Sequence, residues 1–320
     1  MSKEVNDMKK IVRPLVVATM LLGLASQQVY AIDTTAINEK WGKPTVVYGG
    51  GLNDQQIKET SLLLGIKDEN TVTTTKATGE DLVKYLGAGE ANTSVMISSV
   101  MVQKRNKGEG VKVHIATPKN ITLVTSEQYA NAAITAGVAD AEIEVAAVSK
   151  VTGESALTGV YKAFEANGVV LDGKRTAVAQ QELELTNQIA QEQSKEKGFD
   201  AAKLDQAMID IKKSLAEIKE KQGQVATKED VERIVNDALK KYGLDKVISP
   251  TQVNNIIQFA LSYQQTSAID SKQVLEQLNS LSNTVKGKIG QLVDQANREG
   301  WFDKIVAFFK EIFSAIFNSK

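Results

Sequence analysis

Residues 120–147 read NITLVTSEQYANAAITAGVADAEIEVAA and carry the clearest secondary-structure signal of the chain. The middle of this stretch predicts a helix that starts at Ser126 and stops at Gly137, because serine is favoured at helix starts and glycine at helix ends. After the glycine, residues 141–148 alternate in polarity as a half-buried strand does. Strand-like and helical runs of this kind alternate across residues 44–172, which is typical of α/β and α+β domains.

Three further runs predict strands outside that stretch, at residues 44–51, 94–102 and 111–117. They are rich in β-branched and apolar residues. The polar residues 103–110 separate the last two runs and predict a hairpin connection between them.

The remaining helices of this part are predicted at residues 52–66, 79–87 and 153–168. Asn53 is the expected N-cap of the first, and Gln56, three residues later, completes a capping-box pattern. These elements predict an α+β or α/β domain over residues 32–172.

Residues 173–298 lack strand signals and predict an all-helical region. Apolar side chains recur there three or four positions apart, for example at Met208, Ile211, Leu215 and Ile218. Thr227 and Ser249 are expected helix caps, and Pro250 follows in the first helical position, which tolerates proline. These stripes predict helical hairpins or a small bundle.

The first residues of the chain predict a signal peptide. Lys9, Lys10 and Arg13 precede an apolar run at 15–24, and small residues lead up to a cleavage position after Ala31. The apolar run is about half of the roughly 20 residues that a membrane span needs. Residues 1–31 are therefore predicted to be removed during export.

The composition excludes several classes of function. The chain has 38 Lys and Arg against 39 Asp and Glu, a balance that does not favour nucleic-acid binding. It has no cysteine, which excludes disulfides, thiol nucleophiles, thiolate zinc sites and a lipidated cysteine anchor. Its stability must come from packing.

Four segments carry a resemblance to known proteins: YGGGLNDQQ at 48–56, ISSV at 97–100, the stretch at 120–147 and ALTGVYKAFE at 156–165. On these segments the α/β part resembles the YpuA-like family, exported proteins of Gram-positive bacteria classed as a domain of unknown function. Val148 stands where the family pattern suggests a proline. The resemblance implies an extracytoplasmic setting and transfers no catalytic residue.

The glycine-rich turn after the first strand is one candidate ligand site. Gly49, Gly50, Gly51 and Asn53 lie where a strand meets a helix start, a position that can present backbone N–H groups to an anion. The lysine of a phosphate-binding P-loop and the GxGxxG spacing are both missing. Tight packing is the alternative explanation for these glycines.

The titratable residues form no evident catalytic set. His114 is the only histidine and is expected as a partly exposed strand residue. Asp140, Glu142 and Glu144 alternate along a strand; we expect them on its wet face, with a calcium site as the alternative. Ser194 and Lys197 match an SxxK pattern only within a charged helical stretch. No catalytic residue, metal site or cofactor is assigned.

The end of the chain, residues 299–320, predicts an amphipathic helix. Large apolar residues recur there at helical spacing: Trp301, Ile305, Phe308, Phe309, Ile312, Phe313 and Ile316. Such a stripe needs a surface to lie against, because burial of its side chains only about balances the entropy of ordering the segment. Three surfaces remain open: the protein's own helices, a protein partner and the membrane interface.

These observations favour an exported, cell-envelope-associated protein of binding or interaction type, not an enzyme. Its partner would be a cell-envelope component or the membrane surface, with a protein partner as an alternative and no nucleic acid. An envelope-acting hydrolase that uses carboxylates is the second hypothesis, and a small-ligand binding module at the glycine turn is the third.

Overall fold

The computed structural model describes residue 32 and residues 41–87 and 89–296, with side chains described up to residue 290. Its strands are β1 (Thr45–Gly49), β2 (Thr73–Ala77), β3 (Ser99–Lys104), β4 (Val111–Ile115) and β5 (Ala141–Ala146). Its helices are α1 (Asp54–Leu63), α2 (Gly79–Leu86), α3 (Ser126–Ala136), α4 (Ser155–Ala166), α5 (Gly173–Gln193), α6 (Ala201–Gln222), α7 (Lys228–Lys241), α8 (Pro250–Tyr263) and α9 (Lys272–Ala296). Short 3₁₀ turns, η1 (Glu69–Thr71) and η2 (Thr93–Val95), complete the order.

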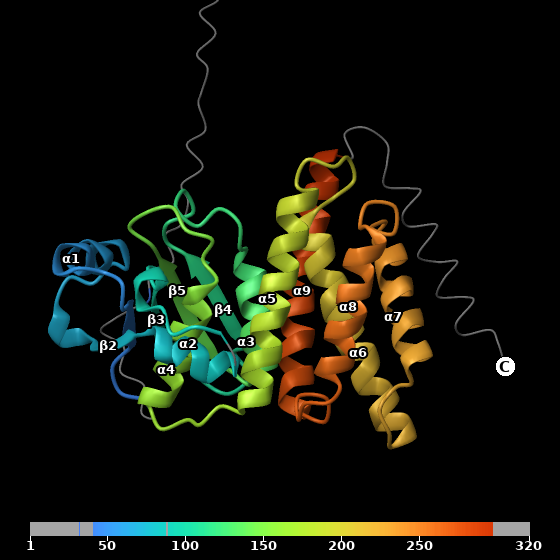
Figure 1. Cartoon of the computed structure of the whole chain (residues 1–320), viewed down its shortest axis with the longest axis horizontal. Helices are drawn as coiled ribbons and strands as arrows, with labels where there is room; N and C mark the ends of the chain where they lie inside the picture. Colours follow the sequence, from blue (N-terminus) through green and yellow to red (C-terminus); the bar gives the residue numbers. More distant parts are fainter. Residues whose placement is uncertain (1–31, 33–40, 88, 297–320) are drawn as a thin grey trace, which may run out of the picture. The chain divides into compact units, whose positions relative to one another are not determined.

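The predicted fold class is confirmed for these residues: a strand-and-helix part comes first and helices alone follow (Figure 1). The expected amphipathic helix at 299–320 lies outside the described residues.

The strands form one mixed five-stranded sheet in the order β2-β1-β3-β5-β4. β1 runs parallel to β2 and antiparallel to β3, while β5 runs antiparallel to β3 and parallel to β4. The predicted hairpin between β3 and β4 is therefore wrong, because β5 lies between them. The connection at 105–110 turns around the start of β5 instead, where the Arg105 N–H donates to the Asp140 carbonyl at 2.6 Å.

Two strands also differ from the sequence-based expectation: β2 was not predicted, and β3 begins later than expected. β2, with the sequence TTTKA, is an edge strand whose side chains are largely exposed, so it lacks the apolar alternation by which strands are recognised. The strand expected at 94–102 begins only at Ser99, because the chain before it turns through η2.

The two faces of the sheet are covered differently. Helices α3 and α4 cover the first face, where Val100, Val102, Ile143 and Val145 join the main apolar core. Gly159 lets α4 approach closely, since a Cβ there would lie 3.0 Å from the Val100 side chain.

The second face carries a smaller apolar cluster. Its buried members are Ile32, Val46, Tyr48, Leu64, Ile66, Val72, Met101 and Ala146. Ile57 of α1 packs against this cluster, and the Tyr48 hydroxyl lies 2.7 Å from the Ser61 hydroxyl of the same helix. Ile32 is thus a component of the interior, although it precedes β1 and belongs to no strand or helix.

Local capping signals were predicted correctly. The Asn53 side chain accepts from the Gln56 N–H, and the Gln56 side chain accepts in return from the Asn53 N–H. Thr227 caps α7, and Ser249 caps α8 with Pro250 in the first turn.

The helical region packs directly on the strand-and-helix part. Helix α5 starts at Gly173, with Asp172 accepting from the first free N–H groups, and both α5 and α9 contact α3. One continuous buried cluster runs from Val47 of β1 to Val285 of α9. The predicted stripe of Met208, Ile211 and Leu215 is buried within it.

Candidate functional site

The glycine turn after β1 is filled by its own chain. The amides of Gly50 and Gly51 donate to the carbonyls of Ala77 and Met96, at 2.7 and 3.0 Å. The Gly49 amide donates to the Ser99 hydroxyl at 3.0 Å. A Cβ on Gly49 would lie 2.2 Å from the Met96 carbonyl oxygen. Close packing therefore accounts for these glycines, and the Asn53 side chain is used as a helix cap, so the proposed anion site gains no support from the geometry.

Asp140 is not on a wet strand face, as the alternation had suggested. It immediately precedes β5, is 3% exposed and adopts a left-handed backbone conformation with φ of 49°. Its Oδ1 accepts from the amides of Gly108 and Gly110 and from the Gln277 side chain, each at 3.0 Å. These contacts join the β3–β4 connection to α9, which gives Asp140 an architectural role.

Glu142 and Glu144 share one sheet face but differ in burial. Glu142 is partly exposed and pairs with Arg105 at 3.2 Å. Glu144 is only 2% exposed, so the prediction of a wet face is wrong for this residue too. The reason is Ile32, whose side chain covers this face and whose N–H donates to Glu144 Oε1 at 3.0 Å.

Glu144 has an unusual electrostatic setting. Burial raises its pKa to about 7, the Ile32 N–H opposes that shift, and the negative charge of Glu142 adds to it. His114 faces it from β4, with Nδ1 4.0 Å from Glu144 Oε1. That nitrogen is buried and makes no hydrogen bond with the described residues. Glu144 is thus a buried carboxyl whose hydrogen-bond donor is the neutral N–H of Ile32. The His114 imidazole is too far away to donate a hydrogen bond to it.

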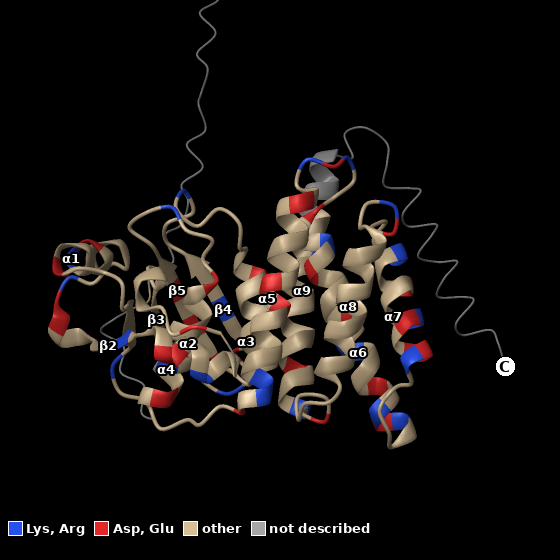
Figure 2. Ribbon diagram, viewed as in Figure 1, with Lys and Arg blue, Asp and Glu red and all other residues tan. Residues whose placement is uncertain are grey.

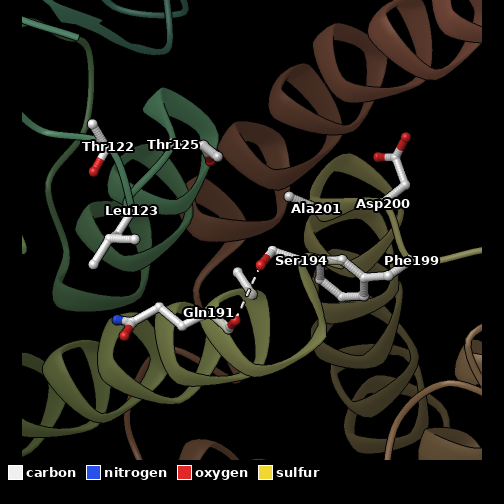
Figure 3. Close-up of a pocket in the computed structure, with 9 residues that line it drawn as sticks. Thr122, Leu123, Thr125, Gln191, Ser194, Phe199, Asp200 and Ala201 are labelled. Carbon is white, nitrogen blue, oxygen red and sulfur yellow. Dashed lines mark hydrogen bonds between the residues drawn. The ribbon is translucent and has the colours of Figure 1, made fainter. Parts of the chain in front are cut away.

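A hollow lies where the segment before α3 meets the end of α5 and the start of α6 (Figure 3). Its volume is 620 Å³, and it is lined by Thr122, Leu123, Thr125, Ala190, Gln191, Ser194, Phe199, Asp200 and Ala201. Ser194 lies in its wall, but the hydroxyl donates to the Gln191 carbonyl at 3.1 Å. Asp200 caps α6. Neither side chain is arranged as an activated nucleophile.

Asp205 lies behind this hollow. The carboxyl is 2% exposed, and its Oδ2 accepts from the Thr125 hydroxyl at 3.2 Å, while Oδ1 has no hydrogen-bond partner within the described part. Burial raises its pKa well above the ordinary value, and the nearby charge of Glu127 adds to the shift. A raised carboxyl pKa beside a hollow is a combination found at catalytic sites.

A buried ion pair that sequence reasoning missed holds α3, α5 and α6 together. Lys212 is fully buried, and its ammonium donates to Glu182 Oε1 at 2.7 Å, to Asn131 Oδ1 at 2.7 Å and to the Thr135 hydroxyl at 2.9 Å. The Thr135 hydroxyl in turn donates to Glu182 Oε2 at 2.6 Å. The sequence signal was a lysine in phase with the apolar stripe of α6, four residues after Met208.

Charges on the rest of the surface are mixed. Figure 2 shows Lys and Arg interspersed with Asp and Glu along the helices, most clearly on α7. Within the described ranges no cluster of three or more His, Asp or Glu side chains is arranged to hold a metal ion. No helix of that part is both long and apolar enough to cross a membrane. The aromatic stripe from Trp301 to Ile316 lies outside the described residues.

A family model and a curated protein both match this chain. A family model described as "Protein of unknown function (DUF1002)" matches residues 48–281. The chain is also similar to "Uncharacterized protein YpuA" of Bacillus subtilis (strain 168), with 30% identity over 97% of this chain and 98% of the relative. No solved structure matches.

Proposed function

This chain belongs to the DUF1002 family, as its resemblance to the YpuA-like family predicted, and we propose that it is an exported protein of the cell envelope that acts by binding. Residues 1–31 direct export, and residues 299–320 form an amphipathic helix that rests on the membrane surface. The strand-and-helix part and the helical region then form one body held close to that surface.

The distribution of exposed apolar side chains supports this role for the tail. Within the described residues, the exposed large apolar side chains are Leu62, Leu63, Val95, Val169 and Val170. All of them precede α5. Within residues 173–290 no large apolar side chain is classed as exposed, so this part of the helical region offers few partners to a stripe of seven large apolar residues. A lipid interface provides such a partner, and Trp and Phe beside Lys suit its headgroup boundary.

Liposome co-sedimentation of the chain from residue 32 to 320 tests this proposal. Phe309→Asp with Ile312→Asp places two charges on the apolar stripe, whereas Ala307→Asp with Ser314→Asp places two charges on the opposite side of the same helix. We expect the first pair to abolish sedimentation with neutral phosphatidylcholine vesicles and the second to preserve most of it. Equal behaviour of the two variants, or no binding by the unchanged chain, would contradict the membrane role.

Export is tested separately in a Gram-positive host. The account predicts that the protein is recovered outside the cytoplasm and that its first residue is Ile32. Recovery of the full-length chain from the cytoplasm would contradict it, whatever the liposome experiment shows.

Asp205 favours a hydrolase that uses carboxylates as the second candidate. Its raised pKa would suit a general acid, but a substrate in the hollow could reach it only if Thr125 moved aside, because that side chain lies between them. Incubation of the chain with purified cell-wall polymer tests this role. Release of soluble fragments that Asp205→Asn abolishes would support the hydrolase, and no release would exclude it for that polymer.

A further inference from the structure

Glu144 lies in a site that suits a cation better than the amide it now contacts. Its carboxyl is 2% exposed on the sheet face that Ile32 and α1 cover. The charged and titratable side chains on this face belong to four strands: His114 and Lys112 of β4, Glu142 of β5, Tyr48 of β1 and Lys76 of β2. His114 Nδ1 stands 4.0 Å away, and Lys112 is the strand partner of Glu142, not of Glu144. A buried carboxylate of this kind is stable only when a close positive charge compensates it.

The group that faces this carboxyl is the backbone nitrogen of Ile32. The nitrogen lies 3.0 Å from Glu144 Oε1, and the Ile32 side chain is 4% exposed among Val46, Met101 and Ala146. Packing of the apolar side chain therefore fixes the position of Ile32, and in that position its main-chain nitrogen points toward the carboxyl of Glu144. In the unprocessed chain this nitrogen is a neutral amide that provides one hydrogen bond.

The same nitrogen is the atom that cleavage after Ala31 sets free. Hydrolysis of the bond between residues 31 and 32 consumes one water, leaves a carboxylate on Ala31 and gives Ile32 a primary amine. With an ordinary pKa of about 8, that amine takes up a proton at neutral pH. The positive charge then arises at hydrogen-bond distance from Glu144 with no rearrangement of either residue.

We propose that Glu144 is the binding site for the α-ammonium group of Ile32, created when the signal peptide is removed, and that this ion pair locks the processed chain. The inference rests on the proposed export and adds to it a structural consequence of cleavage. In the unprocessed chain, Glu144 accepts a hydrogen bond from the neutral amide of Ile32. In the processed chain, the carboxylate of Glu144 pairs with the α-ammonium group of Ile32. Removal of the leader thereby stabilises the exported form specifically.

Two forms of the chain distinguish this site from ordinary packing. One begins at Ile32, released by precise cleavage of a fusion partner, and the other retains Ala31, which moves the amine away from Glu144. Each is made with Glu144 intact and as Glu144→Gln, with Glu142→Gln as the matched control on the same strand and face. We expect the Ile32 form to have the higher Tm, on the order of 5 °C, and Glu144→Gln to remove that difference while Glu142→Gln leaves it.

The reactivity of the amine gives a second readout, which a structural role of Glu144 alone would not change. At pH 7, an amine-selective ester should modify the Ile32 α-amine at least about tenfold more slowly with Glu144 than with Glu144→Gln, because one pKa unit is a tenfold change in free amine. If Glu144→Gln does not fold, acetylation of the Ile32 amine in the unchanged chain replaces it, and the acetylated chain should lose the added Tm.

Several results would overturn the inference. A Tm difference between the two forms that persists in Glu144→Gln, or equal amine reactivity in both, would show that the ammonium is not bound there. Because the N-terminus of these chains is made by cleavage of a purified fusion protein, such a result would not bear on whether the protein is exported. An N-terminus other than Ile32 on the exported protein would instead overturn the processing step.

Discussion

Lys212 and Glu144 are both buried charged side chains, but their surroundings differ. Lys212 meets Glu182, Asn131 and Thr135, so every direction of its ammonium is met by an acceptor. Glu144 meets one backbone N–H. The difference shows that burial alone does not define a structural charge. A completely partnered charge fixes the architecture, whereas an incompletely partnered one retains the capacity to bind.

Asp140 belongs with Lys212 in this comparison. It precedes the same strand that carries Glu144 and has similar burial, yet its Oδ1 accepts three N–H donors from residues 108, 110 and 277. Asp140 and Glu144 therefore differ in the number of hydrogen-bond donors that the chain supplies to each carboxyl group. Substitutions can test this comparison.

The largest effect is expected at Lys212. Lys212→Met leaves Glu182 buried without its cation, which should lower the free energy of unfolding by about 3–5 kcal/mol. Urea unfolding measures this, with Lys213→Met, the next residue of α6, as the control. Adding Glu182→Leu should restore part of the loss, because an apolar pair carries no buried charge. A loss below about 1 kcal/mol for Lys212→Met would remove the distinction between the two sites.

The next effect is expected at Glu144 in the chain that retains Ala31. Its folded pKa of about 7 lies above the unfolded value, so the folded state binds more protons between these two values. Stability should therefore fall as the pH rises from about 4.5 to about 7 and then level off. Glu144→Gln should flatten this profile and stabilise the chain at pH 8 by up to about 3 kcal/mol. An unchanged profile in that variant would show that another group titrates.

A smaller effect is expected at Asp140. Asp140→Ala removes the acceptor of three buried donors and places alanine at a φ of 49°, which should cost about 1–3 kcal/mol. Asp140→Asn keeps an acceptor oxygen and tolerates the left-handed backbone, so it should cost less. Thermal unfolding of the two variants checks the order. Equal losses would indicate that the negative charge, not the hydrogen bonds, is what matters.

The smallest effect on stability is expected in the tail. If residues 299–320 lie on a membrane surface, Phe309→Asp with Ile312→Asp should change the free energy of unfolding by less than about 0.5 kcal/mol in the absence of lipid. Urea unfolding without vesicles measures this. A loss of more than about 2 kcal/mol would place the stripe in the interior with Lys212 and exclude the membrane as its main contact.

Sequence reasoning succeeded where the signal was local. The helix from Ser126 and the strand after Gly137 follow from neighbouring residues, as does the Asn53–Gln56 capping box. The position of β5 between β3 and β4 was missed because strand order depends on contacts between distant segments. β2 was missed because an exposed edge strand needs no apolar face.

The candidate site shows the same limit. Glu144 alternates with apolar neighbours as an exposed residue would, and the residue that covers it lies 112 positions away. Lys212 lies in phase with the apolar stripe of α6, but its partners on α3 and α5 are distant in sequence. Residue type and spacing therefore identified β5 and α6. The groups that contact Glu144 and Lys212 become visible only in the tertiary fold.

The most direct measurement is the pKa of Glu144 by carbon NMR of chains with labelled glutamate, with Glu144→Gln to assign the signal. The chain that begins at Ile32 is compared with the same chain after acetylation of its α-amine. The account predicts a pKa near 7 in the acetylated chain, as burial dictates, and a clearly lower pKa in the free-amine chain. A pKa near 7 in both would contradict the claim that processing creates the cation for this site.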